Sequence, residues 1–159
     1  MKNVKFLLSA ALVFLASAAL AQDFSAPQYA KWGATPEERE QNILNSNFLK
    51  ESCDNRDYDA AAHYLKGLID KIPDAAESIY QRGAVVYKNK INRAKSVAEK
   101  NMFIDSLMLM YDMRAQYFGD NVKPGKTAFI LDQKAREFLR YKPNDRKGIR
   151  EAFRAAIAQ

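Results

Sequence analysis

The amino-acid sequence predicts an all-α fold of about six helices, arranged as stacked antiparallel helix pairs. Three observations lead to this prediction. No run of β-branched or aromatic residues alternates with polar ones, as a half-buried strand would require. Apolar residues instead recur every three or four positions, the spacing of one face of a helix. Helix-start and helix-stop signals, such as Thr35-Pro36-Glu37-Glu38 and Pro73, punctuate these segments.

Residues 1–21 have the three parts of a secretory signal peptide. Lys2 and Lys5 supply the positive start, an apolar run follows, and Ala19-Leu20-Ala21 is a small-x-small cleavage site. The alternative, an uncleaved membrane anchor, is disfavoured because the apolar run is short for a span of about 20 residues. We therefore expect cleavage after Ala21. The remaining 138 residues should form a soluble periplasmic or secreted protein without stable membrane insertion.

The first part of the mature chain is predicted to be an irregular leader over 22–34, followed by a helical domain over 35–159. Trp32 is expected to cover the end of the first helix. Thr35 can cap that helix, Pro36 suits its first turn, and Glu38 completes a capping box. The helix should end near Asn55, with a buried stripe of Leu44, Phe48, Leu49 and Ser52.

The second helix is predicted to open at Asp57 and to stop at Pro73, because the residue before a proline is driven out of helical geometry. Its expected buried stripe is Ala61, Ala62, Leu65, Leu68, Ile69 and Ile72.

The third helix should run from about 75 to 94, capped by Asp74, and the fourth from about 98 to 118. Gly119 is expected to end the fourth helix as a left-handed cap. Residues 119–125 are the best candidate for a flexible connection. Two last helices, over about 126–141 and 145–158, complete the set. Each pair leaves apolar surface uncovered, so adjacent pairs are expected to stack.

The hairpin at 42–75 resembles a tetratricopeptide repeat. Its second helix opens with Asp57-Tyr58, and the family's conserved packing slots hold Ala61, Leu65, Leu68 and Pro73. Gly83 occupies the family's close-approach glycine slot in the next pair, where a glycine costs about 1 kcal/mol relative to alanine and indicates tight helix crossing. The chain departs from the family pattern at Asn45 and Leu49, where the family prefers Trp and Gly, and at Leu68, which replaces a small residue. As a whole it is similar to the divergent exported repeat proteins of the Bacteroides group.

The resemblance implies a partner-binding groove lined by the first helix of each pair. Aromatic, amide and cationic groups in such a groove suit an extended peptide. The groove-facing slots that the resemblance assigns are Ser46, Asn47, Lys50, Tyr80, Gln81, Tyr87 and Lys88.

The sequence contains few residues of the kinds that form catalytic or metal-binding sites. His63 is the only histidine and Cys53 the only cysteine, so we expect no catalytic, metal or cofactor site. Removing Lys2 and Lys5 with the signal reduces the formal charge from +6 to +4, a modest and dispersed excess that argues against nucleic acid as a partner.

Two clusters allow more than one interpretation. Met102, Met108, Met110 and Met113 are expected to be core, although methionines can also form an adaptable binding groove. The basic run Lys88, Lys90, Arg93 and Lys95 is expected to be a solvated elbow, with contact to an acidic partner or a phospholipid headgroup as the alternative.

The function predicted from the sequence is therefore that of a non-catalytic periplasmic scaffold or adaptor that binds a protein or peptide in the cell envelope. The alternative is an exported helical domain that binds a ligand such as a glycan, on which Trp32 and the tyrosines would stack. Self-association is left open.

Overall fold

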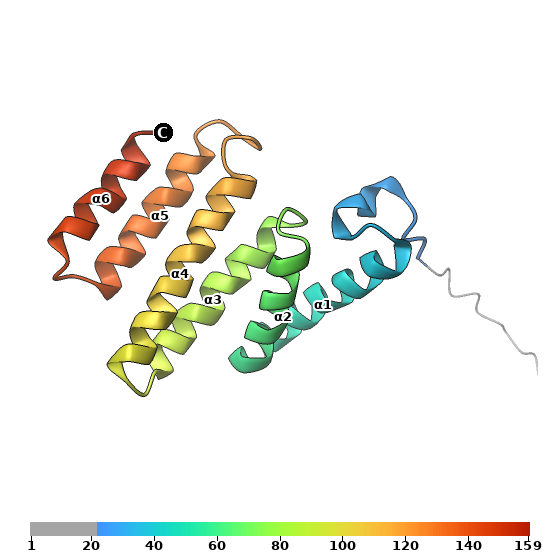
Figure 1. The fold of residues 1–159 in the computed structure, drawn as a ribbon, viewed down its shortest axis with the longest axis horizontal. Helices are drawn as coiled ribbons and strands as arrows, with labels where there is room; N and C mark the ends of the chain where they lie inside the picture. The colour runs from blue at the N-terminus through green and yellow to red at the C-terminus, as the bar shows by residue number, and fades with distance from the viewer. Residues whose placement is uncertain (1–21) are drawn as a thin grey trace, which may run out of the picture.

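The computed structural model describes residues 22–159, and the predicted signal peptide lies outside them. This part of the chain contains helices and no strand (Figure 1). In chain order the helices are the short 3₁₀ helix η1 (Pro27–Trp32) and the α-helices α1 (Pro36–Asp54), α2 (Tyr58–Lys71), α3 (Glu77–Arg93), α4 (Val97–Phe118), α5 (Lys126–Tyr141) and α6 (Arg146–Ile157).

The six α-helices form a single array in which each one packs against the helix before and after it in the sequence. Figure 1 shows α1 and α6 at opposite ends of this array, with η1 beside the start of α1. α1 also contacts α3, the first helix of the next pair. The predicted all-α fold of stacked antiparallel helix pairs is thus confirmed.

Local capping explains where the first two helices begin. The Thr35 hydroxyl accepts a hydrogen bond from the Glu38 amide at 3.2 Å, and the Glu38 carboxylate accepts from the Thr35 amide at 3.4 Å. This is the predicted capping box. Asp57 caps α2 by accepting a hydrogen bond from the Ala60 amide at 3.1 Å. Both starts therefore follow from short sequence signals.

Two predicted helix boundaries are wrong, the start of α3 at Asp74 and the left-handed end of α4 at Gly119. Asp74 does not cap α3, because the helix begins at Glu77 after the cap position Ala76, which makes no side-chain cap. Gly119 ends α4 with φ −86°, outside the left-handed region. Its role is close approach instead: a Cβ there would lie 2.3 Å from both the Ala115 carbonyl oxygen and the Thr127 hydroxyl.

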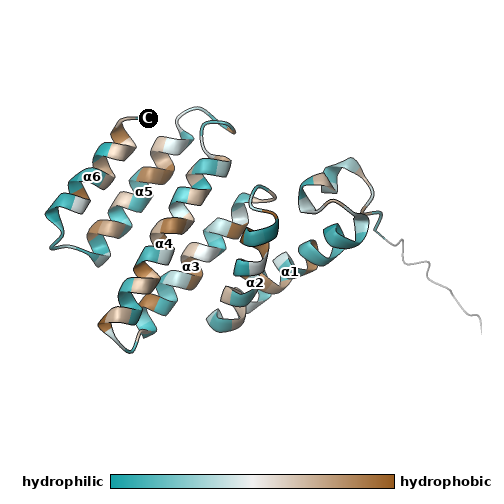
Figure 2. Ribbon diagram, in the orientation of Figure 1, coloured by the Kyte–Doolittle hydropathy of each residue, from teal (hydrophilic) through white to brown (hydrophobic). Residues whose placement is uncertain are grey.

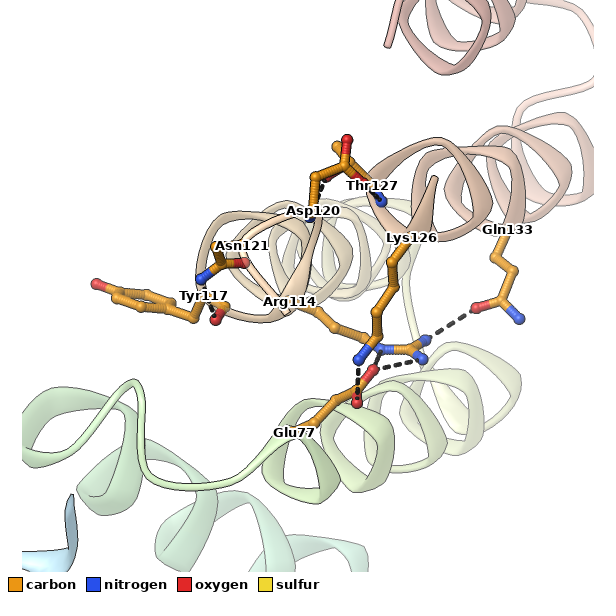
Figure 3. Close-up of polar contacts among 8 residues, drawn as sticks. All are labelled: Glu77, Arg114, Tyr117, Asp120, Asn121, Lys126, Thr127 and Gln133. Carbon is orange, nitrogen blue, oxygen red and sulfur yellow. Dashed lines mark hydrogen bonds and ion pairs between the residues drawn. The ribbon is translucent and has the colours of Figure 1, made fainter. Parts of the chain in front are cut away.

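The connection between α4 and α5, for which we predicted flexibility, is closed by two reciprocal hydrogen bonds. The Asp120 amide donates to the Thr127 hydroxyl and the Thr127 amide donates to the Asp120 carboxylate, each at 2.9 Å (Figure 3). The left-handed residue in this connection is Gly125, with φ 77°.

The leader contains the 3₁₀ helix η1 and is therefore more regular than predicted. Trp32, its last residue, is half-buried and packs against the core next to α1. The Asn42 side-chain amide donates a hydrogen bond to the Trp32 carbonyl at 2.7 Å. This contact ties the leader to the first helix.

The core consists of two clusters, bridged by Tyr87, which packs against both. The first cluster joins α1, α2, α3 and part of α4 and includes Leu49, Ala61, Leu65, Leu68, Ile79, Tyr80 and Val86, with Met110 and Phe118 from α4. The second joins α3, α4 and α5 and includes Ala84, Ile91, Phe103, Ile104, Leu107, Tyr111 and Ile130. Because α3 and α4 contribute to both clusters and Tyr87 packs against both, we expect the clusters to unfold together.

One predicted stripe is partly wrong. Leu44 and Phe48 of α1 are each 41% exposed, whereas Leu49 is fully buried and Asn42 is nearly so. Among the residues that the structure describes, α1 stands at the end of the array and contacts η1, α2 and α3 alone, and these elements leave its far side uncovered. Phe48 instead packs beside Tyr64 of α2, with ring centroids 5.4 Å apart.

Hydrophobic and hydrophilic turns alternate along the later helices, α4 among them (Figure 2). Within residues 22–159, none of the helices combines the length and the apolar character that crossing a bilayer would require.

Candidate functional site

A largely apolar groove lies between α2 and α4, with α3 as its floor. Its volume is about 560 Å³. α2 and α4 make no direct backbone approach, because both pack on α3. We call this the α2–α4 groove. It is lined by Ala62, His63, Leu65, Lys66, Ile69, Asp70, Tyr87, Lys90, Met102, Phe103, Ser106, Leu109, Met110 and Met113.

The depth of the groove depends on Gly83 of α3. A Cβ at this position would lie 2.7 Å from the Met110 sulfur and 3.2 Å from both terminal carbons of Leu65. Because Gly83 has no side chain, Leu65 of α2 and Met110 of α4 can pack directly on the backbone of α3. A larger residue at this position would push both side chains outward and make the groove shallower. This is the tight crossing that its position in the sequence indicates.

Two side chains on the α4 wall leave apolar surface open to solvent. Met102 is 55% exposed and Leu109 is 51% exposed, and both line the groove. Met110 and Met108 are buried, as predicted for core methionines, whereas the prediction is wrong for Met102. Met113 is half-buried at the same groove. Methionine is well suited to such a wall because its flexible thioether adapts to different partners.

The charges at the rim of the α2–α4 groove are paired among themselves. Lys66 forms an ion pair with Asp70 at 2.5 Å, and Lys90 pairs with Asp59. A hydrogen bond from Lys90, reinforced by its charge, lowers the pKa of the Asp59 carboxyl. Lys90 also lies over the Phe103 ring, 5.1 Å from its centroid. The rim therefore contributes little unbalanced charge.

A second groove lies between α4 and α6, with α5 as its floor, and has a volume of about 680 Å³. We call it the α4–α6 groove. Leu109 lines this groove as well, so the two grooves adjoin along α4. Its apolar lining is Met108, Leu109, Phe138, Ala152 and Ala155 beside Gly148, and its charged lining is Asp105, Asp112, Lys134, Asp145 and Glu151.

The groove slots predicted from the resemblance are not brought together. Tyr80 contradicts its assignment most clearly: it is 1% exposed, and its hydroxyl donates a hydrogen bond to the Pro73 carbonyl at 2.7 Å. Burial raises the pKa of the Tyr80 phenol. Lys88 is engaged by Glu137 of α5. Of the seven slots, only Tyr87 lines the α2–α4 groove.

The remaining slots lie elsewhere on the surface. Asn47, Lys50 and Gln81 are exposed, and Ser46 is half-buried. Lys50 forms an ion pair with Asp54 one turn later, at 2.7 Å. The residues assigned to packing lie inside the fold: Tyr58, Ala61, Leu65, Leu68 and Gly83 are buried and Pro73 is half-buried.

Part of the predicted solvated elbow is paired. Arg93 lies over the Tyr58 ring, with its guanidinium carbon 5.0 Å from the centroid. Lys88 and Lys90 bind carboxylates of α5 and α2, respectively. These contacts join α3 to α2 and to α5.

The two residues considered for catalysis or metal binding, His63 and Cys53, lie apart from one another. His63 is exposed on the α2 wall of the groove, with its ring 5.6 Å from that of Tyr64. Cys53 is half-buried against the first core cluster, and burial raises the pKa of its thiol. Within 22–159, no three His, Cys, Asp or Glu side chains converge as a metal site would need.

A cluster of charged and polar side chains links α3, α4 and α5 (Figure 3). Arg114 donates from Nε to the Glu77 carboxylate at 2.9 Å and from Nη1 to the Gln133 carbonyl at 2.9 Å. Lys126 donates to the other Glu77 oxygen at 2.7 Å. One carboxylate thus holds two cations from different helices. Because the cluster is partly buried and internally satisfied, we interpret it as structural.

Replacing Glu77 by glutamine should lower the free energy of unfolding by about 1 to 2 kcal/mol at neutral pH, because two partly buried cations lose their counter-charge. Burial alone raises the pKa of Glu77, but the hydrogen bonds and charges of Lys126 and Arg114 lower it by more, to below its ordinary 4.5. This contribution is therefore complete above pH 4.5 and is lost as the pH falls through the lowered value. Urea unfolding between pH 3 and 7 measures the difference from wild type.

The matched control for Glu77 is Glu40→Gln, an exposed carboxylate on α1. Its effect should stay within about 0.5 kcal/mol of wild type. A Glu77→Gln penalty that grows on acidification would contradict the structural assignment of the cluster.

The sequence contains one clue to the α2–α4 groove, although it does not give the position of the groove. α4 carries apolar residues on more than one face, which exceeds what a single buried stripe needs. Met102 and Leu109 are the surplus.

In comparisons with known proteins, no family model, curated protein or solved structure matches this chain.

Proposed function

We propose that the protein is a non-catalytic, tetratricopeptide-like scaffold or adaptor that binds a segment of a partner protein in the cell envelope. The observation that carries the proposal is the α2–α4 groove, with Met102 and Leu109 exposed on its α4 wall. The envelope location rests on the signal expected over residues 1–21.

The shape of the groove supports a helical segment as the bound element. Met102 and Met113 mark its extent along α4, and at 1.5 Å per residue they lie about 17 Å apart, or about three helical turns. An amphipathic helix laid in an apolar groove presents its anchors at intervals of three or four residues. The floor and walls of the groove are themselves helices, so a further helix would extend the packing of the array.

The surface chemistry supports binding by burial of apolar area. Covering a large aliphatic side chain contributes about 1.5 to 3 kcal/mol. The charges at the rim are already paired, so binding need not leave a buried cation or carboxylate without a partner.

Affinity capture from an envelope extract of the source organism tests the proposal. We expect a partner protein to be recovered with the wild-type chain, and the double variant Met102→Ser, Leu109→Ser to reduce its recovery by about tenfold or more, since two apolar contacts are lost. Quantitative mass spectrometry measures recovery.

The matched control is Phe129→Ser. Phe129 is 56% exposed, close to the exposure of Met102, but it lies at the start of α5 away from both grooves. Recovery that falls equally with the control, or not at all with the double variant, would contradict the proposed role of the groove.

A further inference from the structure

The exposed stripe of α4 alternates apolar and acidic side chains. Met102, Asp105, Leu109 and Asp112 recur at intervals of three or four residues, so they share one face of the helix. Leu109, in the middle of the stripe, lines both grooves. A segment that covers Leu109 therefore also meets the carboxylates beside it.

The lining of the α4–α6 groove is markedly acidic. It contains the four carboxylates of Asp105, Asp112, Asp145 and Glu151 against the single cation of Lys134, a formal charge of −3. The whole chain carries +6. The net charge of this groove lining is thus opposite in sign to the net charge of the whole chain.

Some of these carboxylates already have partners. Lys134 contacts both oxygens of Asp112, at 2.5 and 2.7 Å, and one oxygen of Asp145 caps α6 at the Gly148 amide. Glu151 lies 3.9 Å from Lys147, and both of these side chains are largely exposed. Asp105 forms no ion pair within residues 22–159. Asp105 and Glu151, on opposite walls of the groove, are therefore the groups most available to a cationic ligand.

We propose that the bound segment is a cationic amphipathic helix, and this inference rests on the proposed function. Its apolar face covers Met102 and Leu109 in the α2–α4 groove. Its lysine or arginine side chains extend over α4 toward Asp105 and Glu151. Apolar burial provides the affinity, and the carboxylates select the sign of the partner's charge.

Two synthetic peptides of about 14 residues test this inference, a length that exceeds the three turns spanned by the groove. Both place leucine at the same helical positions, and the remaining positions hold only lysine in one peptide and only glutamate in the other. Fluorescence anisotropy measures their binding to the wild-type protein. The net positive charge of the chain would by itself favour the glutamate peptide, so a preference for the lysine peptide is specific evidence for the acidic groove.

We expect the lysine peptide to bind about tenfold more tightly than the glutamate peptide, a ratio that a few partly exposed charge pairs can supply. The double variant Asp105→Asn, Glu151→Gln should reduce or abolish this ratio. The control variant Glu40→Gln should leave it unchanged. Met102→Ser should weaken both peptides by the same factor, because it removes apolar area without changing charge.

The outcomes separate the two proposals. Equal binding of both peptides, or tighter binding of the glutamate peptide, together with a loss in Met102→Ser, overturns the cationic partner and leaves the groove function standing. Failure of both peptides to bind, or binding that Met102→Ser leaves unchanged, overturns the groove itself. A dimer detected by light scattering and dissociated by Met102→Ser would place a second copy of the chain in the groove and overturn the inference.

Discussion

Replacing Tyr80 by alanine should lower the free energy of unfolding by about 3 to 5 kcal/mol, the largest single effect that we expect. The side chain is almost fully buried between the turn before α3 and the end of α4. Its ring lies 6.0 Å from that of Phe118 and 6.3 Å from that of Tyr117. Removing it leaves a cavity that these rings cannot fill. Urea unfolding followed by circular dichroism measures the loss.

Tyr80→Phe separates the ring from the hydroxyl. It should cost only about 1 kcal/mol, because it keeps the packing and loses the hydrogen bond to the Pro73 carbonyl. If Tyr80→Ala retained wild-type stability and reduced partner binding instead, the buried position of this residue would be wrong and the groove slot predicted from the resemblance would be right.

The second large effect is expected for Leu107→Ala, at about 2 to 5 kcal/mol. Leu107 is fully buried in the second core cluster, between α3, α4 and α5. Leu109, two residues later on the same helix, is half exposed and lines the grooves. Leu109→Ala should therefore change stability by less than about 0.5 kcal/mol and affect binding instead.

Leu107→Ala also tests whether the two core clusters unfold as one unit. Trp32 packs against the first cluster, whereas Leu107 belongs to the second, so Trp32 fluorescence reports on the cluster that does not contain the substitution. Because Tyr87 packs against both clusters, the fluorescence and circular-dichroism transitions of the variant should shift together. Two separate transitions, with only the dichroism affected, would show that the clusters unfold independently.

The parts of the fold that could be predicted from the sequence depend on residues close to one another in the chain. Thr35 with Glu38, Asp57 and Pro73 set helix ends through hydrogen bonds or steric limits within one turn, so the limits of α1 and α2 follow from a short window. Gly83 could be assigned because a glycine inside a helix is costly without a packing reason.

The parts that were wrong depend on distant neighbours. Leu44 and Phe48 have helical spacing, but within residues 22–159 the helices that contact α1 leave both side chains 41% exposed. Tyr80 was placed in a groove by analogy, whereas Tyr117 and Phe118 of α4 enclose it. Gly119 is predicted to be a left-handed cap, but glycine is required there by close approach to the Ala115 carbonyl oxygen and to the Thr127 hydroxyl, eight positions away.

The candidate site was missed for the same reason. The grooves lie on the side formed by α2, α4 and α6, and the resemblance directed attention to α1 and α3. Only the relative placement of three helices shows that Met102 and Leu109 stay exposed while Met110 is buried. The surplus of apolar residues on α4 was the available clue. It led to the prediction that Met102 is buried in the core, because methionines at helical spacing are more often buried than exposed.

The most direct test of the account is to locate the lysine peptide on the protein by NMR of isotope-labelled methionine methyl groups. Met102, Met110 and Met113 report on the α2–α4 groove, and Met108 reports on the α4–α6 groove. We predict that the Met102 and Met113 signals shift most and that Met108 shifts with them. The double variant Asp105→Asn, Glu151→Gln should weaken this response. Methionine signals that stay in place while anisotropy shows the peptide bound would contradict it, because the binding surface would then lie elsewhere.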